Sequence, residues 1–83
     1  MNKVISVIPL ADYRLQLKFS TGEETVFDMT SYLDKGVFTQ LRDVTVFKQA
    51  YIAWDTVCWS NELDISPDTL YLKSQKIPAS GVA

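Results

Sequence analysis

The stretch that decides the fold is Tyr13–Met29, YRLQLKFSTGEETVFDM. In its first half apolar residues occupy alternate positions, and the residues between them are polar; the apolar set is Tyr13, Leu15, Leu17 and Phe19. Alternation with a period of two is typical of a strand with one face in water. Gly22 can adopt the positive φ of a tight turn, and Glu24–Met29 then returns as a second strand. The stretch therefore predicts an antiparallel hairpin.

The segments that flank this hairpin supply a further strand and short helices. VISVIPL, Val4–Leu10, is β-branched and apolar on both faces, which predicts a strand that is partly covered on both sides and ends at Pro9. After the hairpin the apolar spacing becomes helical. We expect short helices or turns near residues 31–35, 37–42 and 44–49. They would lay four apolar side chains across the sheet: Leu33, Phe38, Leu41 and Phe47.

The stretch YIAWDTVCWS, residues 51–60, predicts a second hairpin with Asp55 and Thr56 as the turn residues. In this register all the large apolar side chains share one face, while Ala53 and Cys58 share the other; the large set is Ile52, Trp54, Val57 and Trp59. Thr56 is unsuited to positive φ, so a longer loop stays open as an alternative.

Residues 59–71, WSNELDISPDTLY, combine carboxylates with large aromatics, and the question is whether they perform chemistry or begin a helix. Ser66 is a good N-cap, Pro67 suits the first helical position, and Asp68 suits the positive end of the helix dipole. A helix from Pro67 to about Gln75 explains these residues. Asp64 and Asp68 could also serve as an acid–base pair, but a capped helix beside solvated loops is the favoured interpretation.

Together these elements predict a single α+β domain over residues 1–83. A small antiparallel sheet of four to five strands packs against short helices and carries a C-terminal helix. We expect an ordered core over about residues 3–75 and a tail over residues 76–83. The predicted core consists of Val7, Leu15, Leu17, Phe19, Phe27, Leu33, Phe38, Leu41, Phe47, Ile52, Trp54, Ile65 and Leu70.

Composition and charge exclude several classes of protein. Eight basic and ten acidic residues give a net charge of −2. The basic residues are scattered, so direct nucleic-acid binding is not expected. No apolar stretch approaches the roughly eighteen residues of a membrane span. Cys58 is the only cysteine, which fits a reducing, cytoplasmic location, and its place in a predicted strand indicates a small buried hydrophobe.

The chain has no histidine, which removes Ser-His and Cys-His catalysis and the commonest transition-metal ligand. We therefore expect no enzymatic activity, no cofactor and no metal site. Trp54 and Trp59 are expected to pack in the core. Trp59 should be the more exposed of the two, because it borders the polar residues 60–62.

An ordered series of motifs resembles the small bacterial proteins grouped as domain of unknown function 2442. The series consists of V..V.PL.DY.L.L.F..GE (Val4–Glu23), a middle set (Asp28, Gly36, Phe38, Leu41, Asp43, Phe47 and Ala50) and W...LDISPD.LY (Trp59–Tyr71). The resemblance covers about residues 3–75 and implies a small α+β fold. It departs from the common pattern near Asn61–Glu62, where many members carry a glycine. It implies no catalytic residues.

Some members of that family precede a helix-turn-helix domain, whereas others stand alone beside a small partner protein and are proposed to form toxin–antitoxin pairs. This chain, which ends at Ala83, resembles the stand-alone type. We therefore expect a non-enzymatic protein-interaction module, antitoxin-like, that binds a small basic protein. The expected partner-binding residues are Trp59, Asn61, Glu62, Asp64, Asp68 and Tyr71.

Two alternatives remain open. The first is a small-molecule sensing domain, related to the N-terminal domain of helix-turn-helix regulators, with a pocket lined by Tyr13, Trp54 and Trp59. The second concerns assembly: a homodimer could form through an exposed sheet edge.

Overall fold

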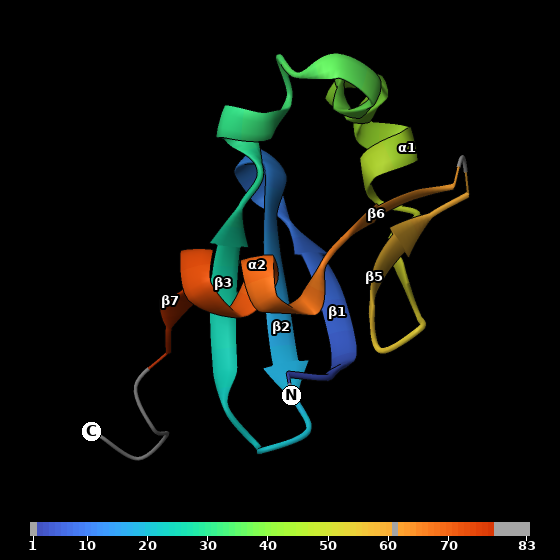
Figure 1. Ribbon diagram of the computed structural model, residues 1–83. Coiled ribbons are helices and arrows are strands. Elements are labelled where there is room, and N and C mark those ends of the chain that lie inside the picture. The colour runs from blue at the N-terminus through green and yellow to red at the C-terminus, as the bar shows by residue number, and fades with distance from the viewer. Residues whose placement is uncertain (1, 61, 78–83) are drawn as a thin grey trace.

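The computed structural model describes residues 2–60 and 62–77 and shows two antiparallel sheets with short helices (Figure 1). The first sheet has the strand order β1-β2-β3-β7, and the second has the order β4-β5-β6. The first consists of β1 (Val4–Leu10), β2 (Arg14–Phe19), β3 (Glu24–Asp28) and β7 (Gln75–Lys76); the second consists of β4 (Tyr51–Ala53), β5 (Thr56–Trp59) and β6 (Leu63–Ile65). The predicted α+β class is confirmed, with the strands divided over two sheets instead of one.

Helical segments connect and cover these sheets (Figure 1). Three are 3-10 helices: η1 (Ala11–Tyr13), η2 (Thr30–Tyr32) and η3 (Gly36–Arg42). Two are α-helices: α1 (Val44–Phe47) and α2 (Pro67–Lys73). The short helices after the first hairpin and the C-terminal helix are thus confirmed. Within the described residues, no helix has the length and the apolar composition needed to cross a bilayer.

The β2–β3 hairpin forms as its alternation predicts. Leu15 pairs with Phe27, and Leu17 pairs with Thr25; all four side chains are buried. Gly22 adopts φ 95° in the turn between the strands, a conformation that glycine reaches without steric cost. The hairpin therefore presents one apolar face to the rest of the chain.

Helix α2 lies across one face of the first sheet (Figure 1), and its Leu70 is fully buried. The helix ends at Lys73, because Ser74 is extended with φ −89° and ψ 162°. The chain then forms β7, in which Lys76 pairs with Thr25 of β3. The predicted extension of the helix to Gln75 is wrong, because Gln75 and Lys76 pair with β3. The rest of the expected tail, residues 78–83, lies outside the described residues.

The cap of α2 gives a first testable prediction. The Ser66 hydroxyl oxygen accepts a hydrogen bond from the Thr69 backbone N–H at 3.1 Å, which satisfies one of the free donors of the first turn. Ser66→Ala should lower the free energy of unfolding by about 1 kcal/mol, measured by urea denaturation. Ser66→Asp keeps an acceptor and should stay close to the wild type. Equal stability of the alanine variant and the wild type would refute the capping role.

The β4–β5 hairpin differs from the predicted register. Ala53 pairs with Thr56, so Trp54 and Asp55 are the turn residues, with φ values of 55° and 62°. Thr56 is buried, and its hydroxyl donates to the Ile65 carbonyl of β6. This contact holds Thr56 in the strand and moves the turn one residue back along the chain. Ile52 and Val57 still share one face of the sheet, now as direct partners, but Trp54 leaves the core.

The buried core joins both sheets and the helices. It consists of Val4, Leu15, Leu17, Phe19, Phe27, Met29, Leu33, Leu41, Phe47, Val57, Trp59, Leu63, Ile65 and Leu70. Val7, Phe38 and Ile52, which are predicted core residues, are partly buried against it. The prediction for Trp54 is wrong, because its side chain is 88% exposed.

The prediction that Trp59 is the more exposed of the two tryptophans is wrong, because Trp59 is fully buried. Only 1% of its surface is accessible, and its indole Nε1–H donates to the Phe47 carbonyl at 3.0 Å. Its ring lies 6.4 Å from the Phe47 ring, which in turn lies 5.3 Å from the ring of Tyr13. Phe47 of α1 thus connects the second sheet to the beginning of β2.

Candidate functional site

The predicted partner-binding residues lie in different parts of the fold. Trp59 is in the core and cannot touch a partner directly. Glu62 is exposed in the turn before β6, and Asp64 is exposed on β6. Asp68 lies in the first turn of α2, where its Oδ1 accepts from Asn2 Nδ2 at 3.1 Å. Asn61 lies outside the described residues. Of the predicted set, Glu62, Asp64 and Asp68 are exposed.

Tyr71, the last residue of that set, belongs to a polar cluster at the first hairpin. Its hydroxyl donates to Glu23 Oε2 at 3.2 Å. Lys76 Nζ lies 3.0 Å from the same oxygen and 5.4 Å from the centre of the Tyr71 ring. This cluster ties α2 and β7 to the turn between β2 and β3, which is a structural explanation for Tyr71.

The cluster predicts a pH dependence of stability. The hydrogen bond from Lys76, followed by that from Tyr71, lowers the pKa of Glu23 below its ordinary value. A carboxyl whose pKa is lower in the folded state stabilises the fold above its unfolded pKa, and this contribution is lost as the pH falls. The melting temperature of Glu23→Gln should therefore fall less than that of the wild type below about pH 4.5. Parallel curves for the two proteins would contradict this role.

Cys58 is a buried and weakly acidic thiol. Burial, and secondarily the charge of Asp64, raises the pKa of the Cys58 thiol. Its Sγ lies 3.5 Å from the Ala53 carbonyl oxygen. A thiol without the thiolate character of a nucleophile is inert at neutral pH. Its predicted role as a small buried hydrophobe is confirmed.

The pocket expected between Tyr13, Trp54 and Trp59 does not form. Tyr13 and Trp59 pack on Phe47, and the Tyr13 hydroxyl donates to the Arg42 carbonyl. Trp54 points outward at the tip of the β4–β5 hairpin. The aromatic side chains that were expected to line a ligand pocket are therefore divided between the filled core and the surface.

Exposed apolar side chains lie instead on the β4–β5 hairpin and at the neighbouring start of β1. The Asp55 carbonyl accepts a hydrogen bond from the Val4 N–H at 2.8 Å, so the Trp54 turn lies beside the start of β1. Ile5 follows Val4 and is 53% exposed, and Tyr51 on β4 is 46% exposed. We call Ile5, Tyr51, Trp54 and Asp55 the Trp54 surface.

The charges of the chain segment that contains Trp54 have one sign. Residues 49–72 contain no lysine or arginine, and we call them the acidic segment. Their carboxylates are Asp55, Glu62, Asp64 and Asp68. The ion pairs within the described residues use other acids, namely Asp12, Asp34 and Glu23. The carboxylates of the acidic segment therefore form no ion pair within the described residues.

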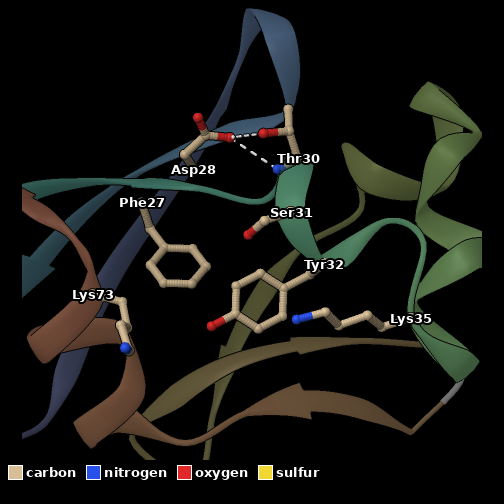
Figure 2. Close-up of a pocket in the computed structure, with 7 residues that line it drawn as sticks. All are labelled: Phe27, Asp28, Thr30, Ser31, Tyr32, Lys35 and Lys73. Atoms are coloured by element: carbon tan, nitrogen blue, oxygen red, sulfur yellow. Dashed lines mark hydrogen bonds between the residues drawn. The ribbon is translucent and has the colours of Figure 1, made fainter.

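An open hollow lies elsewhere, between the end of β3, η2 and the end of α2 (Figure 2). It has a volume of about 410 Å³. Phe27 and Tyr32 lie at its centre, and Lys35 and Lys73 reach into it from different segments (Figure 2). The hollow combines an aromatic surface with two ammonium groups.

The sequence model of a family described as Protein of unknown function (DUF2442) matches residues 4–76. The chain belongs to the DUF2442 family. The match begins at the first residue of β1 and ends at the last residue of β7, so both sheets and all the helices are parts of the DUF2442 domain. No curated protein and no solved structure shows significant similarity to this chain.

Sequence reasoning missed both the Trp54 surface and the hollow of this DUF2442 domain. The exposure of Trp54 depends on a one-residue difference in the turn, and the adjacent Asp55, which tolerates a left-handed conformation, was the available signal. The hollow brings residues 27–35 to Lys73, and no local pattern predicts that contact. The acidic segment, by contrast, can be read directly from residues 49–72.

Proposed function

We propose that this DUF2442 domain is a non-enzymatic protein-interaction module of the cytoplasm. Its partner is a small basic protein, towards which the domain acts in an antitoxin-like role. The observation that carries the proposal is Trp54, whose side chain is 88% exposed at the tip of a hairpin. Tryptophan is among the residues that most often dominate binding energy at protein interfaces.

The conformation of Trp54 supports this assignment. Its φ of 55° lies in the left-handed region, which is unfavourable for bulky side chains and is ordinarily occupied by glycine, asparagine or aspartate in such turns. In this position the indole makes few contacts with the hydrophobic core. A strained residue with a large exposed aromatic surface is better explained by a contact outside the chain than by folding.

The charge of the acidic segment indicates the chemistry of the partner. Asp55 is next to Trp54, and the segment as a whole carries four carboxylates without a compensating cation. A basic partner would be attracted over a distance and oriented by this field. Trp54 would then supply apolar burial at the centre of the contact, and the adjacent Asp55 would supply complementary charge at its rim.

The test is a comparison of two variants that remove exposed apolar surface at different places. Tagged wild-type protein, Trp54→Ala and Leu72→Ala are used to capture partners from the native host, followed by mass spectrometry. Leu72 is 74% exposed on α2 and serves as the matched control. We expect Trp54→Ala to lose a stoichiometric small protein that the wild type and Leu72→Ala retain.

With the purified partner, Trp54→Ala should weaken binding by about 2 kcal/mol, or about 30-fold. Its melting temperature should stay close to that of the wild type, because the side chain is exposed. Equal affinity of the variant and the wild type would overturn the role of Trp54. The antitoxin role is wrong if the partner, expressed alone, does not slow growth.

A further inference from the structure

The hollow beside η2 is built from three segments that are distant in sequence. Phe27 and Asp28 end β3, Ser31 and Tyr32 belong to η2, and Lys73 is the last residue of α2. Figure 2 shows these side chains around one opening, with the Tyr32 ring between the two lysines. Because α2 is fixed on the sheet by Leu70, the position of Lys73 relative to η2 is set by the fold.

Four side chains that carry hydrogen-bond donors in this hollow have no hydrogen-bond or ion-pair partner within the described part of the chain. Lys35 and Lys73 form no ion pair there, and the hydroxyls of Ser31 and Tyr32 form no hydrogen bond there. Lysine offers three N–H donors and no acceptor, and a hydroxyl can donate as well. The hollow therefore presents donors from two ammonium groups and two hydroxyls, which is the chemistry that an anion requires.

Asp28 is the one carboxylate in the lining, and its Oδ1 is directed away from the lysines. That oxygen accepts from the Thr30 N–H at 2.9 Å and from the Thr30 hydroxyl at 2.7 Å (Figure 2). The nearby Asp34 is likewise engaged, by Arg42. Two ammonium groups and the Asp28 carboxylate leave one net positive charge in the hollow. An anion with a single or double charge would be favoured over a cation.

The aromatic surface of the hollow favours an anion that also carries an apolar group over a simple inorganic ion. The Phe27 and Tyr32 rings lie 5.5 Å apart at an interplanar angle of 41°. Lys35 Nζ lies 5.3 Å from the centre of the Tyr32 ring, where a cation is attracted to the ring face. Phe27 is buried beneath Tyr32 as part of the core, so the half-buried Tyr32 ring is the aromatic surface on which a ligand with a flat apolar body could pack while its charged group meets the lysines. The volume of about 410 Å³ is within the range of small-molecule sites.

We propose that this hollow binds a small organic anion, with a phosphate or carboxylate group joined to an aromatic body. Lys35 and Lys73 hold the charged group, Ser31 and Tyr32 donate hydrogen bonds, and the Tyr32 ring, which packs on the buried Phe27, contacts the body of the ligand. The site is independent of the Trp54 surface. The hollow would be the ligand site of a small-molecule sensing domain, and it contains none of the residues that the sequence predicted for such a pocket, which were Tyr13, Trp54 and Trp59.

The experiment is an NMR titration of the full chain, labelled with ¹⁵N, in the absence of any partner. The probes are phenyl phosphate, benzoate, phenol and inorganic phosphate, each added to millimolar concentration. The variants are Lys35→Gln/Lys73→Gln and the matched control Lys18→Gln/Lys48→Gln, which removes the same charge from exposed positions elsewhere. The readout is the set of amide shifts at residues 27–35 and 73.

We expect phenyl phosphate or benzoate to shift these amides saturably in the wild type and in the control variant. Phenol and inorganic phosphate should each bind at least about tenfold more weakly, because each supplies only half of the contacts. The comparison of phenyl phosphate with benzoate identifies the preferred charged group. The Lys35→Gln/Lys73→Gln variant should lose the saturable shifts while it keeps the rest of the wild-type spectrum.

Several outcomes would overturn the proposal. They are the absence of saturable shifts with either aromatic anion, shifts centred outside the hollow, and equal binding by Lys35→Gln/Lys73→Gln. Equal binding of phenol would show that the charge has no role. None of these outcomes bears on the protein partner, because Trp54 is intact and no partner is present.

Discussion

Replacing Trp59 with alanine should lower the free energy of unfolding by about 3–5 kcal/mol. The side chain is fully buried, and it packs on Phe47, which in turn packs on Tyr13. Removal of the indole would leave a cavity where the second sheet meets α1. It would also leave the Phe47 carbonyl without the donor that lies 3.0 Å away. A domain with a total stability of about 5–15 kcal/mol would then be largely unfolded or close to it.

Urea denaturation followed by circular dichroism measures this effect, with two controls. Trp59→Phe keeps most of the apolar volume but removes the N–H donor, and it should cost about 1–3 kcal/mol. Trp54→Ala removes the same side chain five positions earlier, where it is exposed, and should change stability by no more than about 0.5 kcal/mol. If Trp54→Ala were the more damaging variant, the assignment of the two tryptophans to core and surface would be reversed.

The opposite environments of these two tryptophans show where sequence reasoning reached its limit. The pattern of residues 51–60 predicted a hairpin, and the hairpin is present, with the large side chains Ile52, Val57 and Trp59 on one face as expected. Its turn position could not be predicted locally. It depends on the bond between Thr56 and the Ile65 carbonyl, a contact with a strand that comes later in the chain.

Elements with a strong local cause were predicted well. The β2–β3 hairpin follows from alternation and Gly22, and the start of α2 follows from Ser66 and Pro67. Strand β7 and the division into two sheets could not be predicted in this way. β7 has two residues and no apolar alternation. It pairs with the edge of β3 because α2, which directly precedes it, ends next to that edge.

The features of the candidate site likewise differ in whether local sequence predicts them. The acidic segment is a property of composition and could be read from residues 49–72. The Trp54 surface and the hollow are tertiary features. One requires the hydrogen bond between Val4 and Asp55, and the other requires α2 to bring Lys73 next to η2.

Leu70→Ala should destabilise the domain by about 2–5 kcal/mol, the cost of a large-to-small change at a fully buried position. Leu70 has no exposed surface and is the buried residue of α2. It faces the first sheet, so its loss weakens the attachment of the whole helix. Leu72→Ala is the matched control: it lies in the same helix with the same change in propensity, but its side chain is 74% exposed. It should shift stability by no more than about 0.5 kcal/mol.

The attachment of α2 should also control β7, which follows it directly. The Ile77 N–H donates to the Glu24 carbonyl at 2.8 Å, and hydrogen exchange of this amide reports whether β7 is paired. In Leu70→Ala its protection should fall by up to the full loss of global stability, whereas in Leu72→Ala it should be unchanged. If Leu70→Ala left Ile77 protected, β7 would be held by Glu23, Tyr71 and Lys76 alone. Since Lys73 is positioned by the same helix, loss of Ile77 protection would also predict weaker anion binding in the hollow.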